Sequence, residues 1–411
     1  MKKLTYLSYL EASKKSLEIA VPTTLKESVG IQNVLGRVIS TDITCVKNMP
    51  SFDNSAMDGF AVRFSDAGKG LKVKKTILAG EASKTCLTSN TCYRIMTGAQ
   101  VPSDADTIVP IENMIEVNGD YVVLPEKLKK GSNKRIKGEE QAFGNTLFKK
   151  GSKIQATDIA VLASQGITTL EVYKKITIAV VSTGNELKEP WENAGEDEIY
   201  NSNSYALISQ LQENGFEATY AGVIPDSLEE TITYIDGLKN YDVIITSGGI
   251  SLGDADFIAQ AYEQNGLEVA FHGIKVKPGR PTMMGKMGRT YVMALPGNPL
   301  TAMVKSTLLT MPVLNKIQGN NSFHHDFITA KNFESFNTKE GRVNVILGNL
   351  QQGEFRVTQK NKYGSGMLTP LVQSNCIVVT NEENSGIKVG DSVKVILFNS
   401  SLVQNQSNIF N

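Results

Sequence analysis

The chain has little cysteine, histidine or tryptophan. Its 411 residues hold four Cys, three His and one Trp. Cys45, Cys86, Cys92 and Cys376 form no CxxC pair and have no metal-type spacing, which argues against a zinc or dithiol site. We expect four free thiols in a reducing compartment. No HExxH motif is present, and the pair His324-His325 lies in a polar stretch where we expect it to be solvated.

The chain also has no net charge and no long apolar run. Acidic and basic residues number 42 each, which argues against a protein that binds nucleic acid through bulk charge. No apolar stretch approaches the roughly 20 residues that span a bilayer. The N-terminal segment lacks a sustained apolar core and a cleavage site. We therefore expect a cytoplasmic protein that binds neither nucleic acid nor membrane.

Two common nucleotide-binding motifs are missing. The sequence has no Walker A lysine loop and no GxGxxG after a strand, so ordinary P-loop and Rossmann dinucleotide-binding proteins are disfavoured. A length of 411 residues exceeds one ordinary core and predicts two to four domains.

The most informative stretch is Tyr241–Asp256, YDVIITSGGISLGDAD. Its apolar, β-branched start predicts a strand buried on both faces. Glycines then allow a sharp turn close to a ligand. The hydroxyls and N–H groups of Ser247, Gly248, Gly249 and Ser251 suit a phosphate. The carboxylates that follow suit Mg²⁺. The alternative interpretation is a purely structural one, in which a strand is followed by a Gly-rich turn and an Asp that caps the next helix.

The first 175 residues predict a helix followed by small β-rich segments. Residues 5–19 read as a helix with Leu7, Leu10 and Leu17 on one side. A short strand region is expected over 34–46 and a helix over 157–165. Alternating segments with many turn residues predict an inserted all-β unit. Its expected strands are 73–78, 93–96, 107–109 and 121–124.

Beyond residue 175 strands and helices alternate, which predicts βαβ units and a parallel sheet. Asn203 is expected to cap one helix and Ser227 to open another with a capping box. The expected strands are 176–181, 218–224, 242–246 and 291–295, and a helix is expected from about Leu300.

Polar signals follow the carboxyl end of each of these four strands. They are Glu186, Asp226, the 247–256 loop and the turn 296–299. In an open α/β sheet ligands bind at that edge. The sequence therefore predicts a binding site where the four loops meet.

The C-terminal part predicts a small β-barrel or sandwich. A polar linker is expected over 315–326, and short strands with Gly turns follow. The expected strands are 343–347, 355–358, 376–380 and 392–397. The loop 362–367 offers N–H groups and a hydroxyl, and the last dozen residues are expected to be frayed.

Four carboxylates stand out, each in a turn or at a strand end: Asp58, Glu186, Asp226 and Asp256. Singly each suits a cap or a solvated acid, but together they would make an oxygen cage for Mg²⁺. The stiff turn KVKPGRP carries Lys277 and Arg280, which could clamp an anion. We predict that these two cations hold a phosphate or a second oxyanion and that the acids hold Mg²⁺ and orient an attacking oxygen.

Six motifs resemble those of the molybdopterin molybdenumtransferases, the MoeA family that includes the E domain of gephyrin. They are DNSAMDGFAV (53–62), RIMTGAQVP (94–102), VSTGNEL (181–187), TSGGISLGDAD (246–256), KPGRP (277–281) and LPGNP (295–299). They occur in one order over nearly the whole chain, which is more specific than a single Gly-rich loop.

The resemblance implies a multidomain α/β plus β fold in an elongated subunit of a homodimer. It implies an N-terminal linker and dimerisation domain (1–46 and 144–175), an inserted β-rich domain (47–143) and a MogA-like α/β molybdopterin-binding domain with a parallel sheet (176–316). A C-terminal β-barrel domain (319–398) and a frayed tail (399–411) complete it. The site would be shared with loops of the partner subunit.

The reaction that the resemblance implies is insertion of molybdate into adenylylated molybdopterin. The phosphoanhydride is hydrolysed in a Mg²⁺-dependent step, which releases AMP and molybdenum cofactor. A MogA-like adenylyltransferase and molybdoenzyme acceptors are the implied partners. Molybdate and tungstate have nearly the same size and charge, so the choice between them stays open.

The family's functional positions carry over residue by residue. Catalytic roles fall on Asp58, Thr97, Glu186, Asp226 and Asp256, and substrate contacts on Lys277, Pro296, Pro299, Arg135 and Ser365. The metal would be held by Glu186, Asp226, Asp256 and Glu140. Two positions depart from the family: Glu140 stands where Asp is usual, and Gly273 stands where a lysine sometimes occurs, with Lys275 nearby.

Two other functions remain open. A MogA-like adenylyltransferase has a similar α/β domain but is typically that domain alone. A dimeric scaffold like the gephyrin E domain would bind receptor tails without turnover. The acids and cations kept in every loop favour a working enzyme.

Overall fold

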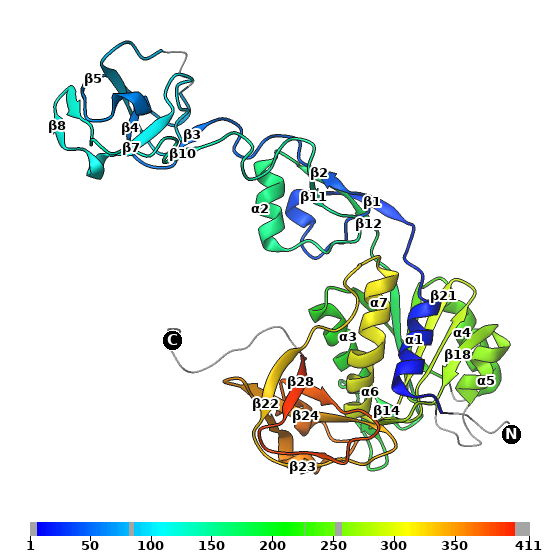
Figure 1. Cartoon of the computed structure of the whole chain (residues 1–411). Helices are drawn as coiled ribbons and strands as arrows, with labels where there is room; N and C mark the ends of the chain where they lie inside the picture. The colour runs from blue at the N-terminus through cyan, green and yellow to red at the C-terminus, as the bar shows by residue number, and fades with distance from the viewer. Residues whose placement is uncertain (1–5, 82–85, 226, 251–256, 399–411) are drawn as a thin grey trace. The chain divides into compact units, whose positions relative to one another are not determined.

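The computed structural model describes residues 6–81, 86–225, 227–250 and 257–398. The chain forms two compact units. Their residues can be followed by the colour bar in Figure 1. Unit 1 comprises residues 1–40, 151–155 and 169–411, and unit 2 comprises residues 41–150 and 156–168. Each unit has hydrophobic cores of its own.

A six-stranded sheet forms the centre of unit 1, in the order β16-β13-β17-β21-β20-β18. The strands are β13 (Ile178–Thr183), β16 (Ala218–Ile224), β17 (Val243–Ser247), β18 (Leu267–His272), β20 (Met283–Met287) and β21 (Thr290–Leu295). The first four in spatial order are parallel and match the predicted strands. Strands β18 and β20 were not among the predicted strands, and β20 runs antiparallel to both of its neighbours, β18 and β21.

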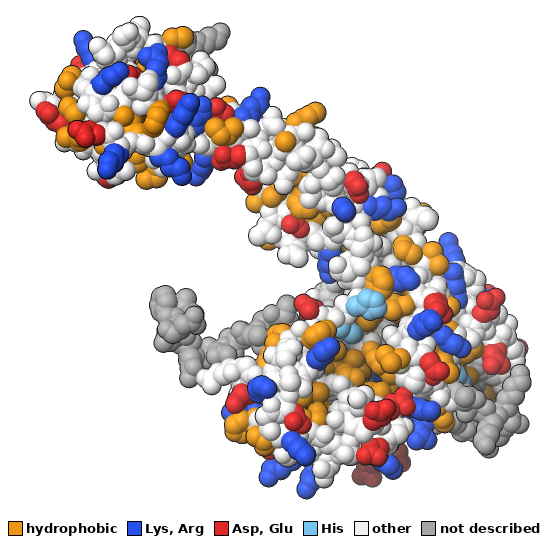
Figure 2. All heavy atoms as spheres, in the orientation of Figure 1, with side chains coloured by type: hydrophobic (Ala, Val, Ile, Leu, Met, Phe, Trp, Pro, Cys, Tyr) orange, Lys and Arg blue, Asp and Glu red, His pale blue; other side chains and the backbone are white. Residues whose placement is uncertain are grey.

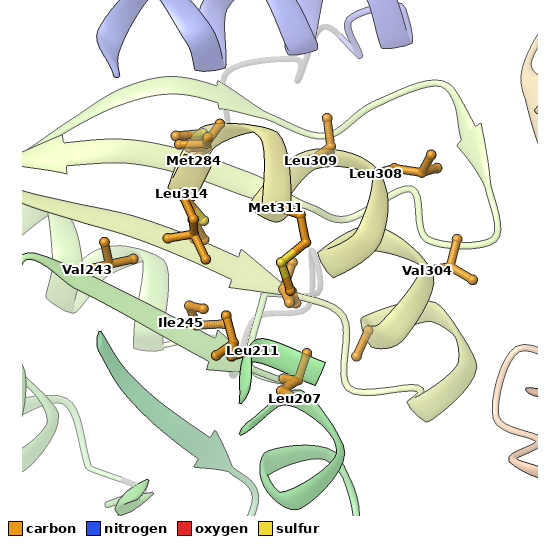
Figure 3. Packing of buried hydrophobic residues seen from close by; sticks show 14 of the residues in the cluster. Leu207, Leu211, Val243, Ile245, Met284, Val304, Leu308, Leu309, Met311 and Leu314 are labelled. Carbon is orange, nitrogen blue, oxygen red and sulfur yellow. The ribbon is translucent and has the colours of Figure 1, made fainter. Parts of the chain in front are cut away.

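Helices cover both faces of this sheet. One face carries α1 (Tyr9–Ile19), α3 (Asn203–Glu213), α6 (Pro299–Lys305) and α7 (Met311–Ile317), and the other carries α4 (Leu228–Gly237) and α5 (Phe257–Gln264). Side chains of β17 alternate between the two cores: Val243 and Ile245 enter the first, and Ile244 enters the second. Figure 3 shows Leu211 of α3 and Leu314 of α7 packed near Val243 and Ile245. The central strand is therefore buried on both faces, as predicted.

The N-terminal helix differs from its prediction. Ser8 caps α1 in a capping box with Glu11. The buried stripe consists of the small residues Ala12 and Ser16, whereas Leu10 is 77% exposed. The prediction that Leu10 shares one side with Leu7 and Leu17 is wrong, because those two pack against the core while Leu10 faces solvent.

A closed five-stranded barrel follows the α/β part of unit 1. Its order is β24-β25-β22-β28-β26, and β26 pairs back to β24. The strands are β22 (Ile328–Asn332), β24 (Val343–Gln351), β25 (Glu354–Val357), β26 (Cys376–Val379) and β28 (Ser392–Leu397). A short pair, β23 (Phe336–Asn337) and β27 (Gly386–Ile387), lies beside them. The four predicted strands are confirmed.

The link between the helices and the barrel starts later than predicted. Helix α7 continues to Ile317, so Asn315 is helical, and the prediction of a linker from that residue is wrong. His325 is half-buried and hydrogen-bonds to the backbone of Leu308, and burial lowers the pKa of its imidazole. The prediction that both adjacent histidines are solvated is wrong for His325.

Unit 2 is built on a second six-stranded sheet, in the order β7-β4-β6-β5-β9-β8. Its strands are β4 (Gly59–Val62), β5 (Gly70–Ile77), β6 (Thr91–Ile95), β7 (Thr107–Pro110), β8 (Glu116–Asn118) and β9 (Tyr121–Val123). Helix α2 (Ala156–Ser164) also belongs to this unit. The predicted all-β insert and the helix near 157–165 are confirmed.

Four further pairs of strands form two-stranded ladders. These are β1 (Lys26–Gly30) with β12 (Thr169–Tyr173), β2 (Ile43–Thr44) with β11 (Thr146–Phe148), β3 (Asn54–Ser55) with β10 (Lys134–Arg135), and β14 (Leu187–Lys188) with β15 (Ile199–Tyr200). The strand region expected over 34–46 reduces to β2 and isolated bridges at Val38 and Ile39. The four cysteines are free thiols, as predicted. None of the helices in the described ranges is long and apolar enough to cross a membrane.

Candidate active site

A cavity of about 770 Å³ lies at the carboxyl ends of the parallel strands of unit 1. We call it the strand-end pocket. The loops after β13, β16, β17 and β21 all contribute to its lining, through Glu186, Pro225, the 247–250 segment and the 296–299 turn among others. The four loops therefore share one edge, as their positions after predicted strands indicate.

The glycines after β17 have a structural reason. Gly248 and Gly249 have φ of 97° and 63°, which L side chains rarely adopt. A Cβ on Gly249 would lie 2.1 Å from Ile258 Cδ1. The N–H of Gly248 donates to the Leu295 carbonyl at 3.0 Å. This N–H therefore ties the loop to β21, whereas the sequence predicted that it contacts the ligand.

Asn203 holds the two central loops of the strand-end pocket together. Its side-chain nitrogen donates to Ser247 Oγ at 2.8 Å and to the Gly297 carbonyl at 2.7 Å. The sequence predicted that Asn203 caps a helix. That prediction is wrong, because Ser202 occupies the N-cap and Asn203 is the first residue of α3. Its amide is directed instead to the loops after β17 and β21.

Glu186 is the predicted acid that the strand-end pocket contains among the described residues. It lines the pocket, and a Cβ on Gly184 would lie 2.6 Å from one of its carboxylate oxygens. Asp226, Ser251 and Asp256 lie outside the described residues. Within the described ranges no three His, Cys, Asp or Glu side chains gather to hold a metal. One carboxylate with nearby hydroxyls is an oxygen donor set of the kind that Mg²⁺ takes.

A second cavity, of about 980 Å³, lies between the 275–280 segment and the barrel, within unit 1. We call it the basic pocket. Strand β19 (Val276–Lys277) pairs with β24 in register, with Lys277 opposite Asn344, and this pairing fixes the cationic turn against the barrel. The cations that line the pocket are Lys275, Lys277, Arg280, Lys339 and Arg342, with Glu340 as the one lining carboxylate that the structure describes.

Arg342 is a member of this pocket that sequence reasoning missed. Its Nε is buried and has no hydrogen-bond partner among the described residues. A buried, unpaired guanidinium nitrogen beside a cavity can donate to an anion inside it. A single Arg between Gly341 and Val343 carries no motif, so no local signal in the sequence could have identified it.

The two pockets meet along two shared segments. Arg280 lines the basic pocket and Pro281 lines the strand-end pocket. Ser365 likewise lines the basic pocket, and the next residue, Gly366, lines the strand-end pocket. Asn298 donates to Ser365 Oγ at 3.0 Å, which links the turn after β21 to the barrel loop. A ligand that spans both pockets would therefore pass the 280–281 turn.

Unit 2 carries the predicted pair Asp58 and Thr97. The Thr97 hydroxyl and backbone N–H both donate to Asp58 Oδ1 at 2.7 Å. These hydrogen bonds, the side-chain one first, lower the pKa of the exposed Asp58 carboxyl. The pair therefore presents a fixed, ionised carboxylate to solvent.

The charged loop 135–140 also belongs to unit 2, as Asp58 and Thr97 do. Arg135 is exposed in β10, which pairs with β3, and Glu140 is exposed with its backbone N–H bonded to the Met49 carbonyl. Asp53, close to Asp58 in the chain, forms an ion pair with Lys134 at 2.9 Å. Glu140 and Glu186 belong to different units.

Known domain families match three parts of the chain. Residues 7–166 match the MoeA N-terminal region (domain I and II), residues 179–316 a probable molybdopterin binding domain, and residues 329–398 the MoeA C-terminal region (domain IV). Together with the strand-end and basic pockets, these matches define a MoeA-type protein of molybdenum cofactor biosynthesis.

Whole-chain relatives give the same result. Molybdopterin molybdenumtransferase of Haemophilus influenzae is 32% identical over 95% of this chain and 98% of its own. The Staphylococcus epidermidis protein of that name is 30% identical over 94% and 96%. A MoeA protein structure from Pyrococcus horikoshii has a TM-score of 0.83 at 26% identity, covering 96% of this chain and all of that one. The chain belongs to the molybdopterin molybdenumtransferase family, which is a family of transferases.

Proposed function

We propose that the chain transfers molybdate into adenylylated molybdopterin, with hydrolysis of the phosphoanhydride and release of AMP. One observation carries the proposal: a pocket at the strand ends, lined by Glu186 and Ser247 among others, adjoins a cationic pocket, and both are lined by the 280–281 turn. Two adjacent pockets of different chemistry suit a reaction that brings a phosphate ester and a separate oxyanion together.

The basic pocket holds the oxyanion in this proposal. Lys277, Arg280 and Arg342 supply positive charge, and Ser365 supplies a hydroxyl. Charged donors of this kind bind an oxyanion more strongly than neutral ones do. A tetrahedral dianion such as molybdate or tungstate suits this set of donors. The cations favour such a dianion over a neutral ligand.

The strand-end pocket holds the organic substrate. The hydroxyl of Ser247 contacts the phosphoanhydride, while Pro296 and Pro299 set the shape of the turn beside it. Asn203 joins both loops and so holds Ser247 in place beside the substrate. Preorganised groups of this kind stabilise charge in the transition state without rearranging during the reaction.

Glu186, with Asp226 and Asp256 of neighbouring loops, is the proposed Mg²⁺ ligand set. When bound, Mg²⁺ would neutralise charge on the phosphoanhydride. Glu140 is not included, because it belongs to unit 2 and Glu186 to unit 1. The role of Glu186 is to supply a carboxylate oxygen from the lining of the strand-end pocket.

We propose that the chain acts as a homodimer and that the Asp58–Thr97 pair takes part in catalysis. The ionised Asp58 carboxylate, held by two hydrogen bonds from Thr97, suits orientation of an attacking oxygen. Asp58→Asn should abolish turnover and leave the fold intact. Unchanged turnover in this variant would remove Asp58 from the mechanism.

The test of the function is a turnover assay with adenylylated molybdopterin, Mg²⁺ and molybdate, followed by AMP release and by molybdenum in the product. Arg342→Met should raise the molybdate concentration needed for half-maximal rate by about tenfold or more, because it removes a charge-assisted hydrogen bond. Arg356→Met is the matched control, since Arg356 pairs with Glu354 and stacks on Phe333 on the barrel.

The same assay separates the alternatives. AMP transfer from ATP to molybdopterin, without molybdate insertion, would identify an adenylyltransferase instead. Absence of both activities in a folded protein would favour the non-catalytic scaffold and contradict the proposal.

A further inference from the structure

A fully buried lysine lies beneath the cationic turn. Lys305 is the last residue of α6 and has an exposed fraction of 0%. Long charged side chains are almost never buried completely without a partner. Nevertheless Lys305 Nζ has no hydrogen-bond partner among the residues that the structure describes.

The turn of the basic pocket rests on this side chain. A Cβ on Gly279 would lie 2.7 Å from Lys305 Cε and 2.2 Å from Thr301 Cγ2. Gly279 and Leu300 also line the basic pocket. The lysine is therefore separated from the proposed oxyanion site by the wall that the turn forms.

A change in helix geometry follows directly after Lys305. Residues Ser306–Thr310 form a π-helical segment, labelled η4, between α6 and α7. Such segments are rare and occur often at functional sites. The hydroxyls of Thr301 and Ser306 are also buried without partners in the described chain. This part of α6 therefore holds several polar groups that the folded chain leaves unpaired.

Among the described residues no carboxylate pairs with Lys305 Nζ. The ionisable groups of the neighbouring segments include Lys277 and Arg280 in the turn and Glu340 and Arg342 in the basic pocket. They also include Tyr9, whose hydroxyl donates to the Leu308 carbonyl, and His325, which bonds to the backbone of Thr307 and Leu308. The parts of α3 and β21 that pack on α6 contribute Gln210 and apolar side chains. Burial lowers the pKa of Lys305 well below its ordinary value of 10.5.

We propose that Lys305 is a concealed cation of the basic pocket: its amine is neutral while the pocket is empty and takes up one proton from solvent when an oxyanion binds against the 277–281 turn. The inference deepens the proposed function, because it adds a positioning residue to the same oxyanion site.

The physical reason is the charge that the oxyanion brings. A dianion next to a low-dielectric wall favours a positive charge behind that wall. An ammonium behind the turn would then hold the turn against the bound anion. In the empty pocket the neutral amine avoids the cost of an unpaired buried charge. The pocket would thus gain a cation only when the oxyanion is present.

Proton uptake is measured by calorimetry of the full-length protein. Molybdate, and separately sulfate, are titrated at pH 8 in buffers that differ in ionisation enthalpy. At this pH both ligands are fully ionised, so neither contributes protons. The wild-type protein should take up about one proton per oxyanion bound. Uptake of none would overturn the inference while leaving oxyanion binding, and with it the proposed function, intact.

Two lysine variants sharpen the test. Lys305→Met should remove the proton uptake and weaken molybdate binding by about tenfold, the loss expected for one interaction with a charged group. Lys153→Met is the matched control, because Lys153 also has a pKa lowered by burial but donates to the Asn214 carbonyl at 3.1 Å. It should leave both quantities unchanged.

The outcomes separate the two claims. Proton uptake that persists in Lys305→Met would show that another group titrates, and would overturn the role of Lys305. Failure of the wild-type protein to bind either oxyanion would overturn the basic pocket and the lysine together. Thermal unfolding of each variant shows that a loss of binding does not come from a loss of fold.

Discussion

The side chain of Asn203 lies between two loops and donates to Ser247 Oγ at 2.8 Å and to the Gly297 carbonyl at 2.7 Å. These loops follow adjacent strands, β17 and β21, and both line the strand-end pocket. One amide therefore joins the two loops to each other. It does so from the first turn of a helix that belongs to neither loop.

Asn203→Ala should reduce turnover more than it reduces stability. Loss of two hydrogen bonds should cost about 1–3 kcal/mol of unfolding free energy, while the misplaced Ser247 should lower kcat. Asn265→Ala is the matched control, since Asn265 donates to the Ile232 and Ala261 carbonyls at 3.0 Å each. Denaturant unfolding and AMP release measured on both variants check the prediction. Equal losses of activity would contradict the positioning role of Asn203.

Gly249→Ala should destabilise the fold more than Gly288→Ala does. Both glycines have positive φ, 63° and 59°, so both variants incur backbone strain on the order of 1 kcal/mol. A Cβ on Gly249 also meets Ile258 Cδ1 at 2.1 Å, whereas a Cβ on Gly288 meets nothing within 4 Å. The difference between the losses of unfolding free energy in the two variants therefore measures the clash of the new Cβ with Ile258 alone. A difference near zero would mean that the loop moves freely away from α5.

Much of the architecture was accessible from the sequence, because buried strands have a local signal. The runs that form β13, β16, β17 and β21 are apolar and are followed by turn residues, so both the strands and their loop-bearing edge could be predicted. Strand β20 (MMGKM) has Gly285 at its centre, and glycine weakens the local signal of a strand. It is buried because it pairs with β18 and β21, and such pairing cannot be predicted from the local sequence.

The pockets were only partly accessible, because tertiary contacts form them. The rigid turn with Lys277 and Arg280 was visible as a motif, but its pairing with β24 was not. Arg342 and Lys305 have no motif at all. Asparagine is a common helix N-cap, so Asn203 was predicted to be one. The neighbouring Ser202 occupies the N-cap instead, and the side chain of Asn203 bonds to the loops.

Thr97→Val should raise the pKa of Asp58. The Thr97 hydroxyl is the main cause of the lowered pKa, and the backbone N–H of the same residue is the second. In the folded wild type the carboxylate is ionised above its lowered pKa and loses these hydrogen bonds as the pH falls through that value. Without the hydroxyl the titration should move upward toward 3.8, the ordinary value.

Carboxyl-carbon NMR titration of Asp58 measures this shift directly. Thr88→Val is a suitable control, since the Thr88 hydroxyl contacts Thr91. Because Asp58 stays ionised at neutral pH in both proteins, any loss of turnover in Thr97→Val should be equal from pH 6 to 9. A pH-dependent loss in that range would show that another group has been altered.

Stability should rise with pH on the alkaline side because of Lys305. Burial lowers the pKa of this lysine in the folded state, while the unfolded chain has the ordinary value of 10.5. Between the two values the unfolded state binds one more proton, so the free energy of unfolding increases with pH by up to about 1.4 kcal/mol per unit. Above 10.5 this contribution is constant.

Lys305→Met should remove this slope and raise stability at neutral pH. The measurement is denaturant unfolding at a series of pH values from 7 to 10 for both proteins. Parallel stability curves for wild type and variant would mean that Lys305 has the same protonation in the folded and unfolded states.

The central claim is that an oxyanion binds in the basic pocket while the organic substrate occupies the strand-end pocket beside it. The most direct test is anomalous diffraction at the molybdenum edge from crystals soaked in molybdate. We expect a molybdenum peak within contact of Lys277 and Arg342, on the far side of the 280–281 turn from Ser247. A peak confined to the strand-end pocket, with the basic pocket empty, would contradict it.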